Sequence, residues 1–224
     1  MTTDTNPTGI KETNQSNRGI DYPNEWRLVR ITEPDIEPVT TAEAKTHMRV
    51  EISDDDTYIG TLITAAREWV EDYTGRALID QTWQLKFQGY SYAMEFFLRR
   101  SPVIAVQSFV YDEAGVATTL ATTKYELTGE RTKWPKIIPT YGQSWPGVNW
   151  ARPLTIQFRA GYADRSASPT EGADKVPAAY KHAIKLLVAH YYENRELVNV
   201  GNLTELPMGV EFLLRPHRCE LSIA

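Results

Sequence analysis

The sequence predicts an α+β fold, in which N- and C-terminal helices form a bundle and an antiparallel β region is inserted between them. Apolar residues recur at helical spacing over residues 53–75 and 177–196, and they alternate with polar residues over 83–88 and 154–160. Because helical periods flank the alternating ones, we expect four parts. These are a disordered tail at 1–27, a helical part at 28–80, a β-rich domain at 81–162, and C-terminal helices with a docking segment at 163–224.

The composition indicates a protein that has a core and no membrane span. The chain has 224 residues, is 42% hydrophobic and carries a formal net charge of −5, so it can bury a sizeable core. It has no Lys/Arg run with which to grip nucleic acid, although a local basic patch stays open. Its one cysteine, Cys219, excludes an internal disulfide and favours a reducing compartment. We find no signal peptide, and no run of about 18 apolar residues that would span a membrane.

Two helices are expected close together in the N-terminal half. Thr40 and Glu43 have the spacing of a capping box and predict a short helix through Arg49. The turn at 50–53 is so short that this helix must fold against the next one.

The second helix, over residues 53–75, organises the rest of the chain. Ser53 and Asp56 have capping-box spacing, and Gly75 can take the left-handed conformation that ends a helix. We expect its apolar stripe to be buried and its acidic face to be exposed to solvent. The stripe comprises Ile59, Leu62, Ile63, Ala66, Trp69, Val70 and Tyr73, and the opposite face comprises Thr61, Thr64, Glu68, Glu71 and Asp72.

Strands are expected at 83–88, 96–98, 103–111, 125–127 and 154–160, with a turn at 112–115. A long loop at 129–153 contains Trp134, Trp145 and Trp150. Such loops stack on sugars or bases, or pack on neighbouring subunits, and we favour the subunit interface.

The last helix, which begins at Pro207, is apolar on two sides. Val210, Leu213 and Leu214 form one face, and Met208 with Phe212 form a second on roughly the opposite side. A helix of about nine residues with this pattern must be sandwiched. We hypothesise that its second layer is another protein chain.

The sequence lacks a recognisable catalytic or metal-binding motif. The four histidines are not paired at the spacing that places two ligands on one helical face. The acidic run at 54–56 is better explained by a helix N-terminus than by cation binding. We therefore expect no enzyme activity, no cofactor and no metal. The histidines are His47, His182, His190 and His217, of which His190 is expected to be a hydrogen-bonded core residue; Cys219 lacks an evident activating partner.

A family resemblance rests on segments spread along the chain. They are EPVTTAEAKTHMRV at 37–50, AAREWVEDYTGRALIDQTWQL at 65–85, SPVIAVQSFVYDEAG at 101–115, WP at 145–146, QFRAGY at 157–162, VPAAYKHAIKLLVAHYYENRE at 176–196 and LPMGVEFLLRPHR at 206–218. In this order they resemble the head-tail connector, or head-completion adaptor, family of long-tailed double-stranded DNA bacteriophages and gene transfer particles. The tail before residue 28 lies outside the resemblance.

The resemblance implies a structural virion protein at the head-tail interface, assembled in the host cytoplasm. It implies a ring, expected to be dodecameric, that lies under the portal and gives a channel for DNA without sequence-specific binding. The implied partners are the portal protein, a tail-side completion or stopper protein, and further copies of the chain. The expected portal or subunit interface comprises Leu206, Met208, Val210, Phe212, Leu213, Leu214, Arg215 and Arg218.

The sequence is compatible with several further hypotheses. An acidic lumen would let packed DNA leave again, so Glu68, Glu71 and Asp72 are candidates for a weakly repelling channel wall; an ordinary solvated face explains them equally well. The chain could instead be a stopper or tail-completion ring protein. A third class is a carbohydrate-binding module that uses Trp134, Trp145 and Trp150.

Overall fold

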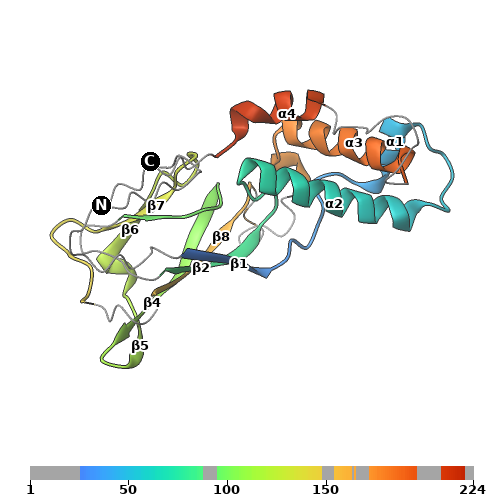
Figure 1. The fold of residues 1–224 in the computed structure, drawn as a ribbon. Coiled ribbons are helices and arrows are strands. Elements are labelled where there is room, and N and C mark those ends of the chain that lie inside the picture. Colours follow the sequence, from blue (N-terminus) through green and yellow to red (C-terminus); the bar gives the residue numbers. More distant parts are fainter. Residues whose placement is uncertain are drawn as a thin grey trace, which may run out of the picture.

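The computed structural model describes residues 26–87, 95–147, 154–162, 164, 172–195 and 208–219. Figure 1 shows an elongated molecule with its helices gathered at one end and its sheets at the other. The helices are α1 (Thr41–Met48), α2 (Asp56–Thr74), α3 (Ala178–Glu193) and α4 (Met208–Leu214), with 3-10 turns η1 (Thr122–Lys124), η2 (Ala173–Lys175) and η3 (Arg215–His217). The predicted α+β class is therefore confirmed.

The described strands form two antiparallel sheets. The five-stranded sheet has the order β1-β2-β8-β4-β5, and the three-stranded sheet has the order β3-β7-β6. The strands are β1 (Trp26–Thr32), β2 (Gln81–Phe87), β3 (Phe96–Phe97), β4 (Val103–Glu113), β5 (Val116–Thr119), β6 (Tyr125–Thr128), β7 (Lys136–Pro139) and β8 (Leu154–Ala160). Buried side chains alternate with more exposed ones along β2 and β8, as their sequences predict.

Three of these strands were not predicted. β5 continues from the predicted turn, and β7 lies within the stretch expected to be a long loop. β1 pairs with β2 and contains Trp26 and Arg27, which the prediction assigned to the tail. Because β1 precedes α1 in the chain, the five-stranded sheet is not built from an insertion alone.

The two ends of the molecule have separate hydrophobic cores. One core lies between the sheets, and the other is enclosed by the four helices. Because each element has one apolar face or stripe, it must bury that surface against a partner layer. The sheet core includes Leu85, Phe109 and Ile156 of the five-stranded sheet with Phe96 and Ile137 of the smaller one; the helical core includes Ile59, Ile63, Ala66 and Val70 of α2, Ile184 and Leu187 of α3, and Val210 and Leu214 of α4.

The cores are joined where β8 ends against the segment that connects α2 to β2. Gly161 has φ 156°, and a Cβ added there would lie 2.6 Å from the Asp80 nitrogen. The Gly161 N–H donates to the Pro102 carbonyl at 2.9 Å, and the Tyr162 N–H donates to the Leu78 carbonyl at 3.3 Å. This close backbone approach requires glycine and fixes the helical end relative to the sheets.

The helix ends agree only in part with the predicted caps. At α1 the capping box is confirmed, because the Glu43 N–H donates to Thr40 Oγ1 at 3.2 Å and the Thr40 N–H donates to Glu43 Oε2 at 2.8 Å. The box predicted at Ser53 and Asp56 is wrong. α2 begins at Asp56, and Asp55 occupies the cap position without a capping side-chain bond.

The carboxylates near the start of α2 bind elsewhere. Asp56 pairs with Lys45 of α1 at 2.7 Å, and Asp55 accepts from Tyr192 and Arg195 at the end of α3. At the other end, Gly75 has φ 69° and ends α2 as predicted. None of the helices in the described ranges is long and apolar enough to cross a membrane.

Candidate functional site

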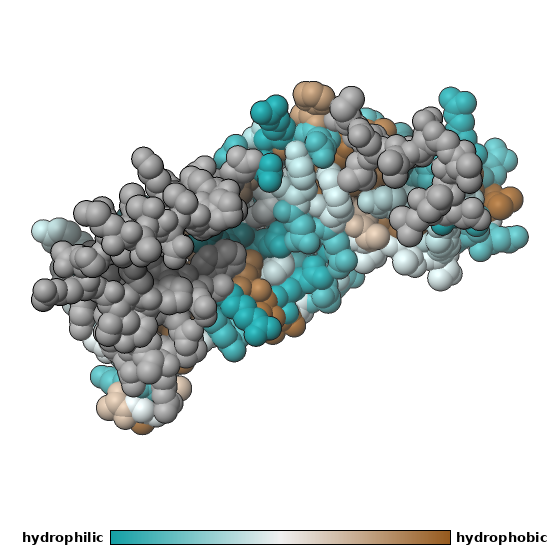
Figure 2. Space-filling view, viewed as in Figure 1, coloured by the Kyte–Doolittle hydropathy of each residue, from teal (hydrophilic) through white to brown (hydrophobic). Residues whose placement is uncertain are grey.

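The C-terminal helix α4 presents one face to the protein and one to solvent. Val210 and Leu214, which the sequence placed at the interface, are instead fully buried in the helical core, whereas the Phe212 side chain is 70% exposed. Figure 2 shows hydrophobic surface on the outer side of α4. The two-sided pattern is thus visible in the single chain, with its outer face uncovered by the described residues. The side chain of Met208, and all of Leu206, lie outside the described residues.

The segment after α4 is anchored to the end of α2. The Cys219 N–H donates to the Thr74 carbonyl at 2.8 Å, and Arg76 Nε donates to the His217 carbonyl at 3.0 Å. The Arg218 guanidinium lies 5.0 Å from the ring centroid of Tyr73. These contacts hold the candidate docking segment at the junction of the two cores. Leu213 is half-buried and Arg215 is exposed, so both remain candidates for the interface.

The Cys219 thiol is affected by its burial. It raises the pKa of the thiol above its ordinary value, although nearby cationic side chains oppose the shift. The thiol is therefore protonated at neutral pH.

The acidic face of α2 is not the uniformly wet surface that the sequence predicted. Glu71 is only 2% exposed, so its expected place on an open channel wall is wrong. Its carboxylate accepts from Arg67 Nη1 at 2.9 Å, from the Leu78 N–H at 2.8 Å and from Gln81 Nε2 at 2.6 Å. Burial raises the pKa of Glu71, whereas the attraction of Arg67 opposes that shift.

The other two acidic candidates, Glu68 and Asp72, are paired with cations of the sheet region. Arg30 of β1 donates to Glu68 at 2.9 Å, and Arg100 donates to Asp72 at 2.6 Å. Arg100 also donates to the Glu71 carbonyl oxygen at 2.7 Å. Its guanidinium lies 4.6 Å from the ring centroid of Trp83 on β2. The acidic face of α2 therefore binds the sheet, and its negative charge is largely neutralised within the chain.

The tryptophans of the predicted loop do not form one surface. Trp145 is 2% exposed and packs in the sheet core, with its ring centroid 5.0 Å from that of Phe96 and 5.2 Å from that of Phe109. Its assignment to a loop interface is wrong, because the apolar side chains of both sheets enclose it. Trp134 is 36% exposed and remains a candidate for an interface. Trp150 lies outside the described residues.

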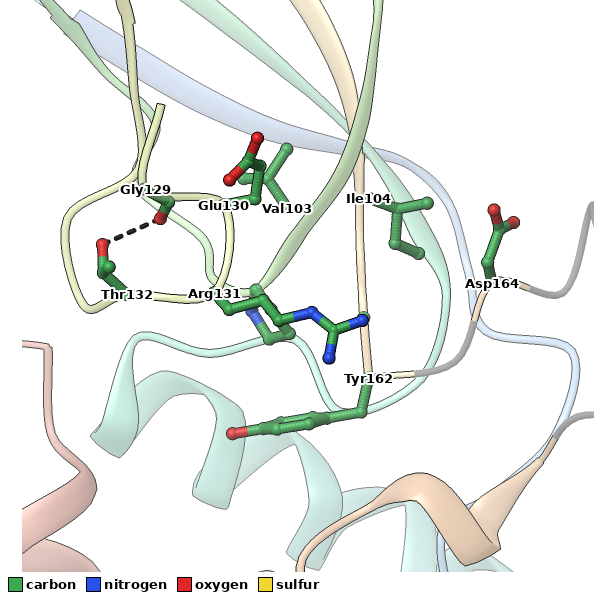
Figure 3. A pocket seen from close by; sticks show the side chains of 10 residues that line it. Val103, Ile104, Gly129, Glu130, Arg131, Thr132, Tyr162 and Asp164 are labelled. Atoms are coloured by element: carbon green, nitrogen blue, oxygen red, sulfur yellow. Dashed lines mark hydrogen bonds between the residues drawn. The ribbon is translucent and has the colours of Figure 1, made fainter. Parts of the chain in front are cut away.

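An open groove of about 670 Å³ lies between the 129–132 turn and the start of β4. Figure 3 shows Arg131 extending into it from the turn, with Tyr162 on the opposite wall. The Thr132 hydroxyl donates to the Gly129 carbonyl at 2.8 Å, which closes the turn. Asp164 at the rim is paired with Arg159 at 2.6 Å.

The histidines are dispersed. His190 is half-buried on α3 beside Asn194, and His47 of α1 meets His182 of α3 edge to face with ring centroids 6.1 Å apart. Burial lowers the pKa of His47 and of His217. Within the described ranges, no three His, Cys, Asp or Glu side chains are grouped so that they could hold a metal ion.

Solved structures share this fold over most of the chain. A chain in the neck of an empty gene transfer agent particle, computed with C6 symmetry, has a TM-score of 0.71 and 24% sequence identity; the match covers 88% of this chain and 98% of that one. A chain in the virion of the native particle has a TM-score of 0.71 and 23% identity, covering 88% and 97%. A chain in the native neck, computed with C12 symmetry, has a TM-score of 0.66 and 24% identity, covering 88% and 98%.

Sequence comparison identifies a shorter region. No curated protein matches the chain. The family model of the phage gp6-like head-tail connector protein matches residues 39–106, from just before α1 into the middle of β4. Over residues 39–106 the match therefore agrees with the head-tail connector family that the sequence resembles.

Proposed function

We propose that this protein is a structural ring subunit of the head-tail interface of a virion, which joins the head to the tail and surrounds a channel for DNA. The family model and the shared fold of neck chains support a connector. Those neck structures were computed with C6 and C12 symmetry, which supports assembly as a ring. We propose twelve copies, from the family resemblance, with the portal on one side and a tail-completion or stopper protein on the other.

The observation that carries this proposal is the two-sided helix α4. Its inner face is buried in the helical core, and Phe212 on its outer face is 70% exposed. Together with the half-buried Leu213 beside it, this exposed aromatic side chain is the apolar part of α4 that a neighbouring protein would cover. A contact between this face and a different surface of the next copy is heterologous, and repetition of such a contact around an axis closes a ring.

The test is the assembly of a Phe212→Ser variant, measured by light scattering of the protein alone and mixed with its portal, followed by electron microscopy. We expect the variant to keep the thermal stability of the parent and to lose the ring or the portal complex. Val116→Ser is the matched control, because Val116 is 64% exposed on β5, far from α4 in the fold. If both variants assemble like the parent, α4 is not the interface.

The same samples separate the alternatives. Binding to tail components without binding to the portal would reassign the protein to a stopper or tail-completion ring. The carbohydrate-binding alternative required three tryptophans on one surface, and Trp145 is enclosed in the sheet core. Trp145 is therefore unable to contribute to a carbohydrate-binding surface.

A further inference from the structure

The five-stranded sheet has a second face, opposite to its core. Along β2, the core side holds Trp83, Leu85 and Phe87, and the other side holds Thr82, Gln84 and Lys86, which are half-buried or exposed. We call this second side the outer sheet face. From the strand register, its members are Arg27, Val29, Thr82, Gln84, Lys86, Ala105, Ser108, Val110, Thr155, Gln157 and Arg159.

The outer sheet face contains amide, hydroxyl and cationic groups. Its next residue on β4, Asp112, is only 8% exposed and accepts from the Gly115 N–H at 3.0 Å. One row across the sheet runs Val29, Gln84, Gln157 and Ser108 in register. Arg159 is neutralised by Asp80 and Asp164. The exposed charge among these members is therefore that of Arg27 and Lys86.

Arg27 and Lys86 are directly opposite each other on β1 and β2, and both are exposed. Neither has an ion pair with another residue that the structure describes. Like charges directly opposite on paired strands destabilise a sheet. A bound anion between them would turn this repulsion into attraction.

The chemistry of the face favours a phosphodiester backbone as that anion. Phosphate oxygens in protein–DNA complexes are bound by Arg, Lys, Ser, Thr and Gln side chains, which are the polar groups present here. An acidic polypeptide would be expected to meet aromatic anchors, and the face has none. Two cations in each copy give a weak, sequence-independent contact that moving DNA can leave.

The acidic residues considered for a channel wall do not offer an alternative surface for DNA, because each is paired with an arginine of the same chain. Glu68, Glu71 and Asp72 of α2 are neutralised by Arg30, Arg67 and Arg100, respectively. We infer that the outer sheet face, through Arg27 and Lys86, contacts the phosphate backbone of DNA. This inference rests on the proposed function and deepens it, because it names the surface of the ring that faces the DNA.

The test is the binding of unrelated duplexes to the full chain, measured by fluorescence anisotropy over a series of salt concentrations. We expect Arg27→Gln with Lys86→Gln to weaken binding about tenfold near 0.1 M salt and to reduce the slope of log K against log salt by about 2, equally for every sequence. The matched control is Arg131→Gln with Lys133→Gln, which removes the same charge from the exposed turn after β6. The control should keep the parent slope.

Equal losses in both double variants would overturn the inference, because net charge alone would then explain the binding. An unchanged salt slope in the outer-face variant would also overturn it, as would reduced binding to polyglutamate with unchanged binding to DNA. Light scattering of the same samples keeps the two proposals apart. Rings that form without binding DNA contradict only this inference, whereas a chain that never forms a ring contradicts the proposed function.

Discussion

Arg67 Nη1 donates to Glu71 Oε2 at 2.9 Å, one helical turn away on α2, and both side chains are only 2% exposed. The other oxygen of Glu71 accepts from the Leu78 N–H and from Gln81 at the start of β2. Arg67 also pairs with Glu37 at 2.9 Å. One buried carboxylate therefore links a helix, the connection that follows it and the first residue of a strand.

Replacement of Glu71 should be strongly destabilising. Glu71→Ala leaves Arg67 buried without its nearest buried carboxylate and leaves the Leu78 N–H unsatisfied, so we expect the free energy of unfolding to fall by about 3–5 kcal/mol. Asp72→Asn, at an ion pair whose carboxylate is 74% exposed, should cost less than about 1 kcal/mol. Urea denaturation measures both. Similar losses of stability in the two variants would show that the buried pair contributes no more than the exposed one.

Gly161 should not tolerate a side chain. A Cβ at this position would lie 2.6 Å from backbone atoms of Ile79 and Asp80, which cannot move without displacing the start of β2. We expect Gly161→Ala to lower the free energy of unfolding by about 3 kcal/mol. Gly60→Ala is the control, since nothing lies within 4 Å of its added Cβ on α2, and it should stabilise by up to about 1 kcal/mol. Thermal unfolding compares the two variants. An unchanged unfolding midpoint in Gly161→Ala would show that the backbone at Ile79 and Asp80 can accommodate a side chain at this position.

Asp55 should make stability depend on acid pH. The hydrogen bond from Tyr192, followed by that from Arg195, lowers the pKa of Asp55 below its ordinary value of 3.8. A carboxyl group with a lowered folded pKa contributes stability that is present above the unfolded value and is lost as pH falls through the folded one. Asp55→Asn should therefore be less stable than the parent at neutral pH, and the difference should vanish in strong acid.

The measurement is the unfolding midpoint of parent and variant across that pH range. Asp54→Asn is the control, because Asp54 is exposed and its replacement removes the same charge one residue earlier in the chain. A pH-independent difference for Asp55→Asn would mean that the ionised carboxylate contributes nothing through these bonds.

Local signals in the sequence predicted the features that depend on neighbouring residues. The cap formed by Thr40 and Glu43, the end of α2 at Gly75 and the alternation along β2 all need only a few adjacent residues, and all three are confirmed. β1 escaped prediction because a register shift between Arg30 and Thr32 interrupts its alternation. β7 is short and ends at a proline, which resembles a loop in sequence.

Features that depend on distant residues could not be predicted. Helical spacing placed Glu71 on the polar face, but its burial follows from Gln81 and Leu78, which come after the helix has ended. Asp56 suited a capping box, yet Lys45 of the preceding helix binds it instead. Trp145 is buried because two sheets close around it. On the candidate interface, by contrast, the exposed Phe212 agrees with the two-sided pattern of α4.

The chain passes between the two cores three times, from β1 to α1, from α2 to β2 and from β8 to α3. A cut at any single loop therefore releases no self-sufficient β module, because the edge strand β1 would stay behind. Recombination that exchanged residues 81–162 alone would leave β1 beside a foreign neighbour, with which its register would have to match again. Viable hybrids between relatives should instead exchange the β region together with β1, and a contiguous exchange of this kind carries α1 and α2 with it.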